Sequence, residues 1–138
     1  GKTRQAAPWP KQGRDCPGLM SRSKDLAEEW LCGTDSPAMH SAIGLPQNDN
    51  FQILAEHDEQ HFIFDPGYLG IDRTDNLVVI QITLSEGRTI EQKKLLYKTI
   101  AESLNAELAV RLEDVFINLV EVKKENWSFG NGIAQYAS

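Results

Sequence analysis

The fold of this chain is decided by residues 76–92, NLVVIQITLSEGRTIEQ. The first part of this stretch, 76–84, is an apolar run rich in β-branched residues, which predicts a strand. Thr89 and Gln92 stand three apart, which is the spacing of a capping box, so a helix is expected to begin here. A second apolar run, 114–122, predicts another strand. Strand, helix and strand in one sheet imply a parallel pair with a right-handed crossover.

The helix between these strands is expected to bury one face. Leu96, Ile100 and Leu104 recur at helical spacing and form an apolar stripe. We expect the helix to end at Asn105 and Ala106. Its apolar stripe would then cover one face of the sheet.

The last part of the chain carries a second informative pattern. Strand 114–122 is apolar on both alternations, which predicts a place in the middle of a helix-covered sheet or at a subunit interface. It leads to 127–132, WSFGNG, a glycine-rich turn with large aromatic side chains. Such side chains indicate a hydrophobic lid or a subunit contact. Residues 133–136 are expected to pair as an edge strand.

The beginning of the chain differs in character from the rest. Residues 1–36 contain several prolines and lack a sustained apolar period, so we expect a divergent, loop-rich segment with one short helix over 23–31. The remainder, 37–138, is expected to form the main domain. Two short strands are predicted in it upstream of residue 76, over 50–56 and 61–65.

Composition excludes several classes of function. The 138 residues carry a net charge of −6 and no lysine- or arginine-rich block, so a nucleic-acid partner is not expected. No apolar run is long enough to span a membrane, and no secretory signal is recognisable, so we expect a cytoplasmic protein. Cys16, Cys32, His57 and His61 lack metal-ligand spacing, so neither a metal nor another cofactor is expected.

Several motifs resemble those of the tautomerase superfamily. They are VIQIT at 79–83, GRT at 87–89 and above all WSFGNG at 127–132, and the resemblance extends over 41–136. The similar branch is the one containing malonate semialdehyde decarboxylase and its tautomerase-like relatives. The resemblance implies an α/β (α+β) fold of two β-α-β units in tandem, the first atypical here, with helices packed on one sheet. It also implies a homotrimer that acts on a small 2-keto or enol carboxylic acid.

The resemblance also assigns roles to particular residues. Arg88 matches an arginine that binds the substrate carboxylate and stabilises charge developing on the enolate. Asp49 matches the family aspartate, so both are expected to be catalytic. Trp127, Phe129 and Tyr136 match positions in the aromatic wall of the substrate pocket.

Two departures from the family pattern keep alternatives open. The family's acid or base is an amino-terminal proline, whose amine can be neutral near pH 7 in an apolar pocket. Pro8, Pro10 and Pro17 are internal as written, and an internal proline nitrogen is an amide without basicity. Either the true terminus differs, or processing exposes a proline, or the amine chemistry is absent. In addition, Glu86 replaces the first arginine of the decarboxylase's Arg-Pro-Arg motif.

The sequence therefore predicts a tautomerase-like isomerase that transfers a proton on a small 2-keto acid through Arg88 and Asp49. One alternative is a non-catalytic, oligomeric family member that lacks the proline. The other is a decarboxylase or hydratase of a small 3-oxo acid, which the carboxylate of Glu86 disfavours.

Overall fold

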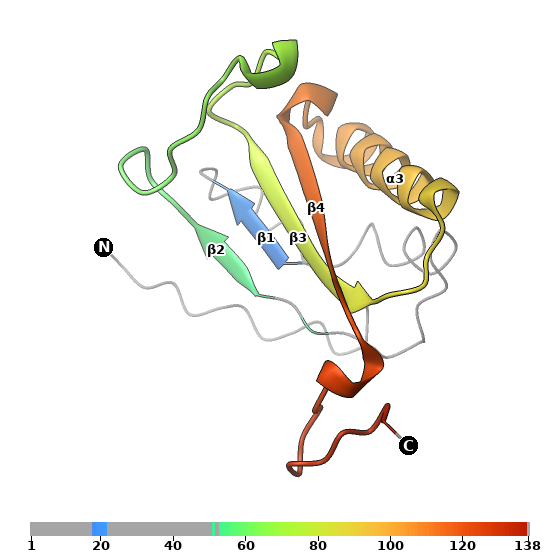
Figure 1. Cartoon of the computed structure of the whole chain (residues 1–138). Coiled ribbons are helices and arrows are strands. Elements are labelled where there is room, and N and C mark those ends of the chain that lie inside the picture. The colour runs from blue at the N-terminus through green and yellow to red at the C-terminus, as the bar shows by residue number, and fades with distance from the viewer. Residues whose placement is uncertain (1–17, 22–50, 52, 138) are drawn as a thin grey trace.

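The computed structural model describes residues 18–21, 51 and 53–137. Within this part, one sheet contains four strands in the order β2-β1-β3-β4. The strands are β1 (Gly18–Ser21), β2 (Leu54–Glu56), β3 (Val78–Ser85) and β4 (Val115–Val122). Helix α3 (Ile90–Leu108) connects β3 to β4 and lies on one face of the sheet (Figure 1). Three short 3-10 helices complete the elements, namely η1 (Tyr68–Gly70), η2 (Leu112–Asp114) and η3 (Lys124–Asn126).

The sheet consists of two parallel pairs of strands. β3 and β4 run parallel, with Val78 opposite Val115 at one end and Ser85 opposite Val122 at the other. β1 and β2 also run parallel, and β1 joins the two pairs by lying antiparallel to β3. Parallel neighbours require a crossover connection, so each pair is one strand–connection–strand unit. The expected α+β architecture of tandem units is thus confirmed.

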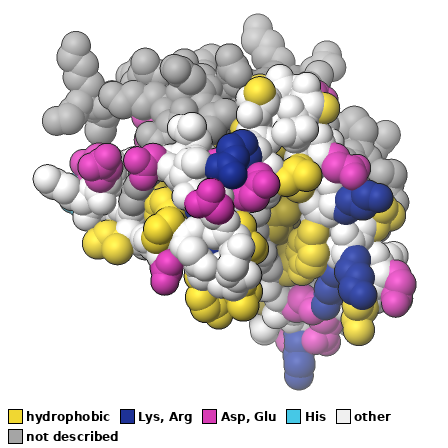
Figure 2. Space-filling model, turned by 90° about the horizontal axis from the view of Figure 1, so that it is seen from above, with side chains coloured by type: hydrophobic (Ala, Val, Ile, Leu, Met, Phe, Trp, Pro, Cys, Tyr) yellow, Lys and Arg dark blue, Asp and Glu magenta, His cyan; other side chains and the backbone are white. Residues whose placement is uncertain are grey.

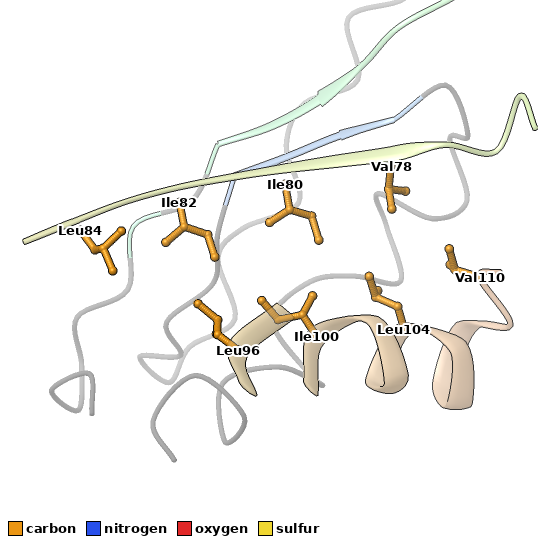
Figure 3. Packing of buried hydrophobic residues seen from close by; sticks show 8 residues of the cluster. All are labelled: Val78, Ile80, Ile82, Leu84, Leu96, Ile100, Leu104 and Val110. Atoms are coloured by element: carbon orange, nitrogen blue, oxygen red, sulfur yellow. The ribbon is translucent and has the colours of Figure 1, made fainter. Parts of the chain in front are cut away.

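The core lies between β3 and α3. Alternate residues of β3 point toward the helix, and the helix stripe points back at them (Figure 3). The buried side chains are Val78, Ile80, Ile82, Leu84, Leu96, Ile100, Leu104 and Val110. Burying a valine, leucine or isoleucine side chain contributes about 1.5–3 kcal/mol to folding stability. This layer therefore stabilises β3 and α3, which carry the candidate site between them. The predicted stripe is confirmed.

Both ends of α3 have specific caps. The backbone N–H of Gln92 donates to Thr89 Oγ1 at 3.2 Å, and the backbone N–H of Thr89 donates to Gln92 Oε1 at 2.9 Å. This pair of bonds confirms the capping box. The predicted end at Asn105 and Ala106 was wrong, because the helix continues to Leu108. Ala109 then takes a left-handed φ of 54°, and the Asn105 side chain donates to the Val110 carbonyl at 2.9 Å.

The segment 1–36, predicted to be divergent and loop-rich, contains strand β1, which pairs with two neighbours, and the rest of that prediction stays untested. Two other predictions from local pattern were wrong. Residues 61–65 form no strand, and residues 133–136 form none either, apart from an isolated bridge between Gly130 and Ile133. The helix predicted over 23–31 lies outside the described residues.

Among the strands of the described residues, β4 lies at an edge of the sheet, so the prediction of a central position was wrong. Its register with β3 directs Val115, Ile117 and Leu119 toward the helix, where they pack on the core. Phe116 and Val120 point to the opposite face and are 44% and 37% exposed. The alternative prediction, a subunit interface on this strand, remains a prediction.

Candidate functional site

The candidate site forms where β3 ends and α3 begins. β4 ends beside it, and the turn that contains Trp127 continues from there (Figure 1). The junction from β3 to α3 consists of Glu86, Gly87, Arg88 and the N-cap Thr89. Gly87 has a φ of 121°, a conformation that favours glycine, so this residue allows the chain to leave the strand and enter the helix sharply.

Arg88 is held against the end of the strand. Its side chain is half-buried, and its Nη1 donates a hydrogen bond of 2.6 Å to the backbone carbonyl of Ser85. A guanidinium has five N–H donors in a rigid fork that suits a carboxylate. Anchoring such a group to the sheet restricts its motion, which reduces the entropy lost when it binds an anion.

The carboxylate of Glu121 lies on the helix-facing side of the same junction. Glu121 is paired with Leu84 in the β-ladder and forms an ion pair with Lys93 from α3. The hydrogen bond from Lys93 lowers the pKa of Glu121 below its ordinary value, and the Lys93 charge, the Gly87 N–H and the Arg88 charge act in the same direction. This carboxylate therefore remains ionised at neutral pH and links α3, β4 and the junction.

An aromatic cluster extends from the end of β3. The Trp127 indole Nε1 donates to Ser85 Oγ at 3.0 Å. Phe129 stacks on Trp127, with ring centroids 5.2 Å apart and planes 9° apart, and Tyr136 meets Phe129 edge-on at 4.9 Å. Phe51 lies 6.4 Å from Phe129. These rings form a continuous apolar surface.

The turn that carries Trp127, Phe129 and Tyr136 is held by its own hydrogen bonds. Gln135 accepts from the Phe129 amide at 2.9 Å and donates to the Gly130 carbonyl at 3.0 Å. Gly130, Asn131 and Gly132 all have positive φ values, which explains the Gly-Asn-Gly sequence of the turn. The turn is therefore compact although it forms no regular strand.

The structure brings together four of the five site residues predicted from the sequence. Arg88 and Trp127 are both hydrogen-bonded to Ser85, and Phe129 and Tyr136 follow Trp127 in the stack. Their roles in binding or catalysis remain predictions. Asp49 lies outside the described residues.

Sequence reasoning missed the residues that hold the site together. Ser85 and Glu121 are ordinary polar residues at strand ends. Their partners become visible only when the register of β3 and β4 is known. Gln135 carried no local signal either, because its two bonds to the turn backbone depend on the conformation of the turn.

The described residues contain no group of three or more His, Cys, Asp or Glu side chains arranged to hold a metal ion. His61 lies 2.5 Å from a carboxylate oxygen of Asp58, and the His57 ring lies 5.9 Å from that of Phe62. Cys16 and Cys32 lie outside the described residues, so the expectation of no metal remains a prediction.

The opposite end of the sheet, which carries η1 and η2, has a different surface. Figure 2 shows acidic and basic side chains next to one another there, with hydrophobic side chains gathered between them.

Among the described residues, no helix is long and apolar enough to cross a membrane.

Comparison with known proteins gives consistent matches. A family model described as "Tautomerase enzyme" matches residues 49–130. "Probable tautomerase YusQ" of Bacillus subtilis (strain 168) is 46% identical over 117 residues, which cover 85% of this chain and 92% of that protein. A solved malonate semialdehyde decarboxylase inhibited by 3-bromopropiolate is 35% identical, with a TM-score of 0.74, over 86% of this chain and 90% of that one. A fused 4-OT solved as a symmetric trimer is 25% identical, with a TM-score of 0.65, over 85% and 94% of the two chains.

Proposed function

The chain belongs to the tautomerase family, and from this premise we propose that it is an isomerase that interconverts the keto and enol forms of a small 2-keto carboxylic acid. The observation that carries the proposal is the fixed pairing of a cation and an aromatic surface at one strand end. Arg88 and Trp127 are bound to the same residue, Ser85. An amphiphilic acid with a charged head and an apolar body suits such a pair.

The proposed chemistry uses Arg88 at two stages. The guanidinium binds the substrate carboxylate through charge-assisted hydrogen bonds. When a proton leaves the carbon next to the carbonyl, negative charge develops on the enolate oxygen. A fixed cation beside that oxygen stabilises the transition state more than the ground state, which lowers the barrier. A substrate bound against the aromatic cluster would displace water from this surface, which would strengthen the electrostatic effect.

Two further roles in the proposal come from the resemblance to the family. Asp49 is assigned polar support of the substrate. Proton transfer is assigned to an amino-terminal proline, whose secondary amine is basic only when it is not part of a peptide bond. Mass spectrometry of the intact mature protein identifies its first residue. A proline there supports the isomerase, and any other residue supports the alternative of a non-catalytic family member.

We further propose that the protein assembles as a homotrimer. Phe116 and Val120 on edge strand β4 expose apolar surface away from α3, which favours burial against another subunit. The match to a fused 4-OT trimer supports the same assembly.

Decarboxylation or hydration of a small 3-oxo acid is the second candidate function. The 35% identity with a malonate semialdehyde decarboxylase favours it. Glu86 disfavours it, because this exposed carboxylate lies two residues before Arg88, where the decarboxylase has a second cation to bind the substrate carboxylate, and a negative charge there repels that group.

The two candidates are distinguished by substrate. We expect the purified protein to convert the enol of phenylpyruvate to the keto form, which is measured as a loss of enol absorbance. We expect it to leave malonate semialdehyde unchanged. Turnover of malonate semialdehyde alone would favour the decarboxylase. Turnover of neither substrate would contradict both and support the non-catalytic member.

A further inference from the structure

Ser85 belongs to both halves of the candidate site. Its backbone carbonyl accepts a hydrogen bond from Arg88 at 2.6 Å, and its hydroxyl oxygen accepts one from the Trp127 indole at 3.0 Å. Any residue at position 85 would supply the carbonyl. The bond to the indole, in contrast, requires a side chain that has an oxygen at this distance from the strand.

The position of Ser85 on the strand makes this bond possible. Val78, Ile80, Ile82 and Leu84 alternate toward α3, so Ser85 points to the opposite face. Ser85 and Trp127 are both half-buried. An indole N–H is a donor only, and leaving it without an acceptor when it is partly buried costs free energy.

The bond also connects two parts of the chain that are 42 residues apart. The turn beyond η3 forms no regular strand, and the bridge between Gly130 and Ile133 is internal to it. Trp127 is the first ring of the stack, and Phe129 and Tyr136 follow it. Fixing the indole therefore fixes the orientation of the whole aromatic surface relative to the sheet.

We propose that Ser85 is a positioning residue, whose hydroxyl holds the Trp127 indole in a set orientation at the strand end where its carbonyl holds the Arg88 guanidinium. This inference rests on the proposed function. A 2-keto acid whose carboxylate is bound by Arg88 would place its side chain against the Trp127 ring. The site would thus prefer 2-keto acids with a flat aromatic side chain, and Ser85 would act through Trp127 without touching the substrate.

The test compares three variants with a matched control. Ser85→Ala removes the acceptor, Ser85→Thr keeps the hydroxyl, and Trp127→Phe keeps a ring but removes the donor. Thr83→Ala is the control, because Thr83 lies on the same face of β3 and is exposed. A single hydrogen bond changes affinity by about 2- to 10-fold.

We expect Ser85→Ala to raise the KM for phenylpyruvate enol by about 2- to 10-fold with little change in kcat. Ser85→Thr should restore KM toward the wild-type value, and Thr83→Ala should leave it unchanged. Combining Ser85→Ala with Trp127→Phe should raise KM no further than Trp127→Phe alone, because both changes remove the same bond. Pyruvate enol, which has no ring, should show a smaller effect of Ser85→Ala.

A second readout does not depend on turnover. The chain has three tryptophans, and Trp127→Phe identifies the indole N–H signal of Trp127 in a nitrogen–proton NMR spectrum. In Ser85→Ala, this signal should shift and exchange faster with water.

An unmoved signal would overturn the proposal. A shifted signal with unchanged KM would also overturn the positioning role and leave the proposed function intact. If the wild-type protein turns over no 2-keto acid, the proposed function fails and the positioning role fails with it, even where the NMR shift confirms the hydrogen bond.

Discussion

Asp114 illustrates how a single residue supports the sheet. It is the buried charged side chain of the described part of the chain, at 1% exposure. Its carboxylate accepts from the Thr74 amide at 2.7 Å and from the Thr74 hydroxyl at 2.6 Å, and Arg111 lies 3.8 Å away. The residue thus anchors the loop before β3 to the start of β4.

Removing this carboxylate should weaken the fold. We expect Asp114→Ala to lower the free energy of unfolding by about 2–3 kcal/mol, because both Thr74 donors lose their acceptor. Urea denaturation measures this loss. Glu113→Ala is the control, since its exposed neighbouring carboxylate should contribute less than about 0.5 kcal/mol. Equal effects of the two changes would contradict this role of Asp114.

Glu121 gives a prediction about pH. Its folded-state pKa is lowered from 4.5, so the unfolded state binds more protons in this range. The stabilisation is fully present above pH 4.5 and is lost as the pH falls through the folded-state pKa. We expect wild type to exceed Glu121→Gln in stability at pH 7, and the difference to vanish in acid. Urea denaturation over a pH series measures this difference, and a difference that does not shrink as the solution becomes acidic would contradict the prediction.

At the residue scale, sequence and structure contribute different information. Arg88 and Trp127 could be singled out because they lie in motifs, Gly-Arg-Thr and Trp-Ser-Phe-Gly, whose spacing is local. Ser85 as their common partner could not be predicted. A bond across 42 residues depends on where β4 ends relative to β3, which no local pattern encodes.

At the scale of elements, α3 and its two strands form the most specified part of the chain. Ile100 is fully buried in the layer between α3 and β3 (Figure 3). We expect Ile100→Ala to cost about 2–5 kcal/mol of unfolding free energy, since it leaves a cavity in a packed layer. Thermal or urea denaturation reports the loss.

Leu95→Ala is the matched control for Ile100→Ala. Leu95 lies on the same helix but is 50% exposed, so its truncation should have a much smaller effect. A loss equal to that of Ile100→Ala would show that the helix packs with a different face toward the sheet.

The same comparison explains which elements could be predicted. β3 and α3 each have a long apolar pattern in the sequence, so both elements could be predicted. β2 (Leu54–Glu56) falls within the predicted strand 50–56. β1 has only four residues, and its pairing with distant strands decides its structure. The run 61–65 contains three consecutive apolar residues, Phe62, Ile63 and Phe64, but forms no strand in the described sheet, so a strand-like composition without a partner strand is misleading.

At the scale of the whole molecule, the sheet has two parallel pairs related through the antiparallel contact of β1 and β3. This leaves β4 as an edge strand with exposed Phe116 and Val120. Such an edge favours association unless it is covered. The expected trimer rests on this surface and on the family.

The mass of the protein in solution tests the assembly. Light scattering should give three times the chain mass of 15.5 kDa. Phe116→Glu should reduce it, because a charge on the exposed face of β4 opposes burial. A wild-type mass of a single chain would contradict the trimer.

The central claim is that Arg88 anchors the substrate carboxylate. Its most direct test is the kcat/KM of Arg88→Ala for phenylpyruvate enol, with Lys94→Ala, an exposed cation on α3, as the control. The account predicts a loss of about 100-fold for Arg88→Ala, partial recovery in Arg88→Lys and no change in the control. An Arg88→Ala protein that folds normally and retains kcat/KM within about twofold of wild type would contradict it.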